Sequence, residues 1–223
     1  MSIILNIDTA LNKASVCLAK DEEILSLAFN DNQTDHAAWL HQAITELLQK
    51  NGNTIDQLNA VAVSIGPGSY TGLRVGLSAA KGLCYALNIP LMAIGTLKLM
   101  ANAVKAGADT FICPMIDARR MEVFTALYNN QLEEIIPAHT LLLDETSFAV
   151  QLATEKILFC GNGSKKLQPF VSHLNATFSG IISDASNLSA LSIISFRNNE
   201  FADLAYTEPL YIKEFYSPAR KAL

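Results

Sequence analysis

The two halves of this 223-residue chain repeat one pattern. Each half opens with an apolar run that ends in Ile-Asp, and the two aspartates, Asp8 and Asp117, lie 109 positions apart. A tight turn and two further strand-like runs follow each aspartate. Because about 100 residues suffice for a small domain, the repeat predicts two related α/β halves, residues 1–108 and 109–223.

Each half is predicted to hold a mixed sheet flanked by helices. Short polar links between the first three apolar runs of a half indicate an antiparallel meander, and helices between the later runs indicate parallel connections. The strands are expected at residues 3–8, 14–19, 23–29, 59–65, 90–94, 111–117, 121–127, 132–136, 156–159 and 178–183. The helices are expected at residues 35–50, 70–87, 96–106, 163–172 and 187–198. A ligand cleft is expected between the halves, and the tail from residue 206 is either a docking segment or frayed.

The first half contains a glycine-rich segment, Ser-Ile-Gly-Pro-Gly-Ser-Tyr-Thr-Gly-Leu-Arg-Val-Gly at residues 64–76. It opens into the expected helix 70–87, where each interior glycine costs about 1 kcal/mol against alanine. Close approach of another backbone would offset that cost. The segment is not a Walker A loop, because Leu73-Arg74 stands where Lys-Ser/Thr is needed. It is one residue too long for the dinucleotide fingerprint.

The helix 70–87 is apolar on nearly every side, which is typical of a helix buried on more than one face. One face is expected to meet the sheet. The other is expected to meet a second protein, together with the helix 35–50, although packing within the chain alone would also explain the glycines. The predicted interface residues are Trp39, Tyr70, Gly72, Leu73, Arg74, Gly76, Leu77 and Ala80.

Three turns are candidates for ligand binding. Asp8, with Thr9 and Lys13, either forms a residual nucleotide site or is a turn aspartate that accepts backbone N–H groups. The turn after Asp117 lacks glycine, and its two adjacent arginines could bind an anion or a partner's carboxylates. The segment 161–164, Gly-Asn-Gly-Ser, either admits the adenosine of a ligand or is a plain strand-to-helix turn.

Several site types are disfavoured by spacing. His36 and His41 are five residues apart, which directs them roughly 140° apart on a helix, so no zinc pair is expected. No Ser/His/Asp or Cys/His constellation is apparent. The four cysteines are widely spaced and form no C-x-x-C pair, which predicts buried, reduced thiols in a cytoplasmic protein.

Composition disfavours two further classes. No apolar run reaches the roughly 18 residues of a membrane span, and the N-terminus does not resemble a signal peptide. The formal net charge is −5 and no run of Lys or Arg reaches five residues. Tight nucleic-acid binding by the chain alone is therefore not expected.

Several motifs together resemble the TsaB (YeaZ) family over residues 1–128, with a similar tail. They are Ile7-Asp-Thr-Ala, Ser15-Val-Cys-Leu, the glycine segment 66–76, Lys81-Gly, Asp117-Ala-Arg-Arg-Met-Glu-Val-Phe and Pro209-Leu-Tyr-Ile. The resemblance implies a duplicated actin/Hsp70/sugar-kinase fold with RNase H-like halves. It also implies a part in making threonylcarbamoyladenosine on tRNAs that read ANN codons.

Within that system, the resemblance implies a non-catalytic subunit required by the paralogue TsaD, with the ATPase TsaE in the same complex and a homodimer when the chain is alone. The chain would need no cofactor, since ATP/ADP and metal belong to the partner subunits. The catalytic paralogue carries a metal-binding pair of histidines four residues apart, which this chain lacks. The alternative is a small-molecule kinase or ATPase of the same fold class, which would need a phosphate loop in each half and a catalytic base.

Overall fold

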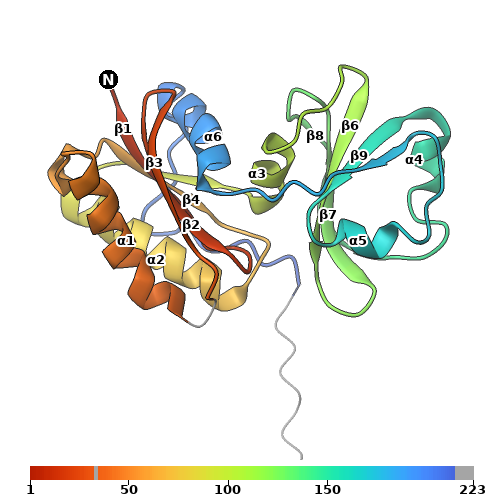
Figure 1. Ribbon diagram of the computed structural model, residues 1–223, viewed down its shortest axis with the longest axis horizontal. Helices are drawn as coiled ribbons and strands as arrows, with labels where there is room; N and C mark the ends of the chain where they lie inside the picture. The colour runs from red at the N-terminus through yellow and green to blue at the C-terminus, as the bar shows by residue number, and fades with distance from the viewer. Residues whose placement is uncertain (33–34, 214–223) are drawn as a thin grey trace, which may run out of the picture.

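The computed structural model describes residues 1–32 and 35–213, which form two lobes side by side (Figure 1). The sheet of the first lobe has the order β3-β2-β1-β4-β5. Strands β1 (Ile3–Asp8), β2 (Ala14–Lys20) and β3 (Glu23–Asn30) are antiparallel. Strands β4 (Ala60–Ser64) and β5 (Leu91–Ile94) run parallel to β1. Polar links of two to five residues allow the first pairings, and the later ones need helical crossovers.

Helices α1 (His36–Lys50) and α2 (Tyr70–Leu87) cover one face of this sheet (Figure 1). Their apolar side chains, such as Leu40 and Leu77, share one buried cluster with Leu5 and Val63 of the strands. A short 3-10 helix, η2 (Ile55–Gln57), leads from α1 into β4.

The second lobe repeats the topology of the first. Its strands are β6 (Thr110–Asp117), β7 (Glu122–Tyr128), β8 (Glu134–Leu142), β9 (Lys156–Cys160) and β10 (Ala176–Phe178). They lie in the order β10-β9-β6-β7-β8, which matches the first sheet strand for strand. Two short helices, α4 (Ala149–Thr154) and α5 (Ser164–Leu167), belong to this lobe. The predicted duplicated α/β fold with mixed sheets is confirmed.

The two halves exchange helices. Helix α3 (Thr96–Asn102) follows the first sheet in the chain but packs on the second, where Leu97 lies in one cluster with Ile112. Helix α6 (Ala185–Arg197) follows the second sheet but covers the open face of the first, where Leu188 lies in one cluster with Ile4 (Figure 1). The predicted boundary after residue 108 thus separates the sheets, while the helix layers cross it.

The tail after α6 packs on the first lobe, and Lys213 near its described end reaches Glu122 of β7 in the second lobe. Ala202 bridges Leu91 at the edge of β5, and the amide of Leu210 donates to the carbonyl of Ile65 at 2.7 Å. The ammonium of Lys81 on α2 donates to the carbonyls of Ala205 and Thr207 at 3.2 and 3.0 Å. Residues 206–213 are therefore docked, and the remainder of the predicted docking segment lies outside the described residues.

Two predicted elements of the second half were wrong. The strand predicted at 178–183 is β10, which ends at Phe178; the following residues instead carry the chain across to α6. The helix predicted at 163–172 ends at Leu167, because Pro169 has no amide hydrogen with which to continue the helical hydrogen bonds. All four cysteines are buried and free, as predicted. In the described part of the chain, we find no helix with the length and apolarity required to traverse a lipid bilayer.

Candidate functional site

The aspartate that ends β1 is enclosed in the first lobe. The side chain of Asp8 accepts hydrogen bonds from Ser64 Oγ at 2.6 Å and from the amide of Ala10 at 3.1 Å. The residue is only 1% exposed. Burial raises the pKa of Asp8, and these two hydrogen bonds oppose the rise without cancelling it. Asp8 therefore serves as a turn aspartate that ties β1 to β4 and to its own turn.

Helix α2 closes over this turn. Thr9 is fully buried, and its Oγ1 donates to the carbonyl of Gly72 at 2.7 Å. A Cβ on Gly72 would overlap the carbonyl oxygen of Thr9, and a Cβ on Gly76 would overlap Thr9 Oγ1. A Cβ on Gly82, which lies further along the same helix, would meet no atom within 4 Å.

The first two glycines of α2 are thus explained by packing within this chain. Contact with the β1–β2 turn offsets the cost of these two glycines to helix stability. Packing within the chain was the alternative that the sequence left open. Neither Asp8 nor Thr9 offers a surface on which a nucleotide phosphate could rest. Of the three predicted nucleotide residues, Lys13 lines a cavity.

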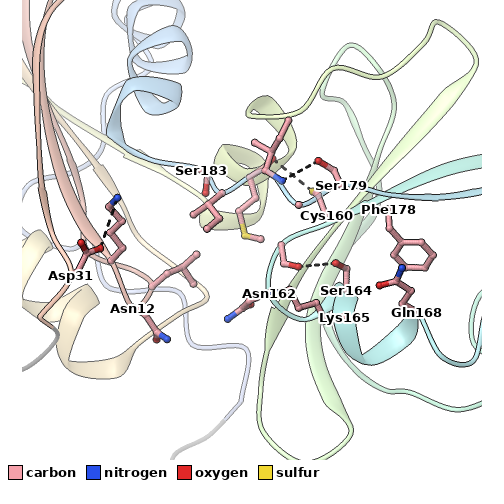
Figure 2. A pocket seen from close by; sticks show the side chains of 17 residues that line it. Asn12, Asp31, Cys160, Asn162, Ser164, Lys165, Gln168, Phe178, Ser179 and Ser183 are labelled. Atoms are coloured by element: carbon pink, nitrogen blue, oxygen red, sulfur yellow. Dashed lines mark hydrogen bonds and ion pairs between the residues drawn. The ribbon is translucent and has the colours of Figure 1, made fainter.

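That cavity is a cleft of about 590 Å³ between the lobes. In Figure 2, Asn12 and Asp31 lie on the side of the first lobe, and Asn162, Ser164 and Lys165 lie across from them. The floor includes Met100 and the crossover segment 178–183. The turn 161–164 was predicted from the sequence as a candidate site. The crossover segment 178–183 was not, because the sequence pattern predicts a strand there.

The cationic groups of the cleft differ in their surroundings. Lys13 Nζ lies 3.9 Å from the ring centroid of Phe29 and 3.8 Å from a carboxylate oxygen of Asp31. Lys165 is exposed. The buried hydroxyl of Ser183 has no hydrogen-bond partner within residues 1–32 and 35–213. The cleft can hold a small polar or anionic molecule, but no nucleophile–base pair faces into it from the described residues.

The equivalent aspartate of the second lobe is exposed and ion-paired. Asp117 accepts from Lys166 Nζ at 2.5 Å and from the amide of Arg119 at 2.7 Å. Its own amide donates to Asn162 Oδ1 at 3.0 Å, which joins this turn to the cleft wall. Partial burial pushes the pKa of Asp117 upward, but the bonds from Lys166 and Arg119 outweigh it, so the pKa lies below its usual value.

The predicted interface residues divide into three groups by their exposure. Five of them are buried within the lobe, and their side chains or backbone are unavailable to a partner in this conformation: Gly72, Leu73, Gly76, Leu77 and Ala80. Trp39 is half-buried and packs against the core of the first lobe. Tyr70 and Arg74 are exposed. Tyr70 and Arg74 are therefore the predicted interface residues that α2 exposes in this structure.

Arg74 joins this surface to the tail. Its Nε donates to the hydroxyl of Tyr211 at 3.0 Å, and its guanidinium lies 4.1 Å from the ring centroid of Tyr70. The rings of Tyr70 and Tyr211 are 5.1 Å apart. Sequence reasoning did not identify Tyr211 as a site residue, although Tyr211 lies in the tail that the sequence offers as a docking segment.

The histidines of α1 do not form a pair. His36 is buried, with Nδ1 3.4 Å from Asn30 Nδ2, whereas His41 is exposed. Among the residues that the structure describes, no group of three His, Cys, Asp or Glu side chains could hold a metal ion.

Comparison with known proteins places this architecture in a family. The family model of TsaD, described as tRNA N6-adenosine threonylcarbamoyltransferase, matches residues 30–219. The tRNA threonylcarbamoyladenosine biosynthesis protein TsaB of Bacillus subtilis is 28% identical over 215 residues, which are 94% of this chain and 93% of that protein. The structure of YeaZ from Pseudomonas aeruginosa superposes with a TM-score of 0.80 at 25% identity, over 95% of this chain and 100% of that one.

This chain belongs to the TsaB/YeaZ family. Because the TsaD family model matches residues 30–219, the chain also belongs to the wider family that this model describes. A polyphosphate/ATP-glucomannokinase from Arthrobacter has the same fold, with a TM-score of 0.50 at 11% identity over 87% of this chain and 99% of that one. The predicted relation of the TsaB/YeaZ fold to sugar kinases is thereby confirmed.

Proposed function

We propose that this chain is a non-catalytic partner subunit in tRNA threonylcarbamoyladenosine biosynthesis. It is required by a TsaD paralogue, which modifies tRNAs that read ANN codons. The observation that carries the proposal is the closed β1–β2 turn, where Asp8 and Thr9 lie buried beneath Gly72 and Gly76. A kinase of this fold class would need that turn open to a nucleotide phosphate.

The names of the relatives support the assignment of this chain to tRNA threonylcarbamoyladenosine biosynthesis. The relative from Bacillus subtilis is named as a threonylcarbamoyladenosine biosynthesis protein, and the matching family model is named for the transferase. We assign the transfer step to the paralogue, because the resemblance gives the paralogue a pair of metal-binding histidines, and His36 and His41 here do not lie on one face. ATP/ADP and metal then belong to the partner subunits, including the ATPase TsaE.

The exposed Tyr70–Arg74–Tyr211 cluster is the proposed contact surface for the paralogue, and for a second copy when the chain is alone in the cytoplasm. The residue types of this cluster support the assignment, because aromatic and arginine side chains contribute most of the binding energy at protein interfaces. The buried residues of α2, such as Leu73 and Leu77, hold the helix that carries Tyr70 and Arg74 against the first lobe.

The alternative function is a small-molecule kinase or ATPase. The interlobe cleft with Lys13 and Lys165 favours it, because cations on both walls would suit a phosphorylated ligand. Hydrolysis would still need a group that activates water or a hydroxyl, and Asp8 is enclosed.

Reconstitution with purified TsaD and TsaE, ATP, threonine, bicarbonate, the adenylate-forming enzyme and tRNA tests the proposal. We expect modified nucleoside only when this chain is present, and negligible ATP turnover by the chain alone. The control is Asp8→Asn, which keeps an acceptor for Ser64 and should support modification as well as the wild type. Robust ATP turnover by the isolated wild type that Asp8→Asn abolishes would establish the alternative instead.

A further inference from the structure

The hairpin turn between β6 and β7 carries two arginines in a conformation that disfavours them. Arg119 has a φ of 69° and Arg120 a φ of 48°. Side chains with a Cβ are disfavoured in this left-handed region, which glycine and asparagine occupy most readily. Strained backbone of this kind tends to occur at functional sites. Packing of the two arginine side chains does not offset the strain, because both are exposed.

The turn is held from both sides by lysines. Lys166 Nζ contacts Asp117 at 2.5 Å and the carbonyl of Glu122 at 3.2 Å. Lys213 Nζ, at the end of the docked tail, contacts the carboxylate of Glu122 at 2.5 Å. The turn is closed by a hydrogen bond of 3.1 Å from the amide of Ala118 to the carbonyl of Glu122.

These contacts leave an uncompensated positive charge. The carboxylates at the two ends of the turn, Asp117 and Glu122, are already paired with lysines. Neither arginine side chain has an ion-pair partner within residues 1–32 and 35–213, and Lys165 adds an exposed cation next to Lys166. This local surplus stands out in a chain whose formal net charge is −5.

We propose that Arg119 and Arg120 contact the phosphate backbone of tRNA in the assembled complex. The inference rests on the proposed function, which supplies tRNA as the substrate. A guanidinium binds a phosphate through two parallel hydrogen bonds, and this turn carries two exposed guanidinium groups at adjacent positions. Two such contacts bind RNA weakly by themselves and add to the sites of a partner when the subunits assemble.

The decisive variant is Arg119→Asn combined with Arg120→Gly. It removes both charges and places at each position a residue suited to the left-handed conformation, so the turn should keep its shape and the melting temperature should stay the same or rise. The reconstituted complex is titrated with fluorescein-labelled, unmodified tRNA transcript at several salt concentrations. We expect binding about tenfold to hundredfold weaker at 0.1 M salt, and a plot of log K against log salt shallower by roughly 1.4 to 1.8.

Two controls accompany this variant. Arg197→Ala removes an exposed arginine of α6 that pairs with Glu22 at 2.8 Å, so it changes the net charge away from the turn and should leave tRNA binding unchanged. Arg119→Lys combined with Arg120→Lys keeps the charge and should keep most of the salt slope.

Wild-type affinity and salt slope in the double Asn/Gly variant would overturn the inference. So would a variant that assembles poorly with the protein partner but, once assembled, binds tRNA normally, because the arginines would then contact protein. The proposed function fails separately: a wild-type chain that neither assembles with the paralogue nor supports modification rejects that function, and with it the basis of this inference.

Discussion

Replacing Gly72 and Gly82 by alanine, one at a time, tests why α2 contains glycine. Both residues lie on the same helix, and both alanines would carry a better helix propensity, by up to about 1 kcal/mol. Gly82 faces open space, so Gly82→Ala should raise the free energy of unfolding by about that amount.

Gly72→Ala should do the opposite. Its Cβ would overlap the carbonyl oxygen of Thr9, a backbone atom that cannot rotate away. Displacing such a packed neighbour costs roughly 1–3 kcal/mol. The shift would also strain the hydrogen bond of 2.7 Å from Thr9 Oγ1 to Gly72, which contributes about 1 kcal/mol. After the propensity gain is subtracted, a net loss of roughly 1–3 kcal/mol is expected.

Urea unfolding followed by circular dichroism measures both variants, since the midpoint and slope give the free energy of unfolding. The two alanines should differ by about 2–4 kcal/mol, with opposite signs relative to the wild type. The reasoning is refuted if Gly72→Ala is as stable as Gly82→Ala. A Gly72→Ala protein of wild-type stability that fails only to bind its partner would restore the interface interpretation of that glycine.

Three further predictions concern other parts of the fold. Because burial raises the pKa of Asp8, the contribution of Asp8 to stability is fully present below the unfolded pKa of about 3.9 and is lost as pH rises through the folded pKa. Asp8→Asn should therefore gain stability relative to the wild type as pH rises above about 4, and parallel urea midpoints would contradict this. A fragment of residues 1–108 lacks α6 and should not fold, which a dispersed NMR spectrum of that fragment would disprove. Lys81→Met should speed hydrogen exchange in residues 205–210 without lowering the global melting temperature, because it removes two hydrogen bonds to the tail; unchanged exchange there would show that the tail is held by other contacts.

Much of the fold could be predicted, because hydrophobic periodicity and the repeat report directly on strands and on topology. Strands such as Ile3–Asp8 and the helix Tyr70–Leu87 lie where the pattern puts them. The errors cluster where local sequence is ambiguous. The apolar pair Ile181–Ile182 resembles a strand, but it belongs to a crossover whose path depends on where α6 must pack.

The candidate site was less predictable, because it depends on which elements meet. The sequence could offer both interpretations of Asp8, but only the position of α2 above Thr9 decides between them. Likewise, the adjacent arginines after Asp117 were visible in the sequence, whereas their left-handed backbone and the lysines at both ends of the turn were not. The exchange of α3 and α6 has no local signal, since it is a long-range packing choice.

The most direct measurement of the central claim is the initial rate of tRNA threonylcarbamoylation at a fixed amount of TsaD, as a function of the concentration of this chain. A required, non-catalytic subunit predicts a rate close to zero in its absence, a rise that saturates at a fixed stoichiometry, and the same curve for Asp8→Asn. Full modification by TsaD without this chain, or saturation at trace amounts of it, would contradict the account.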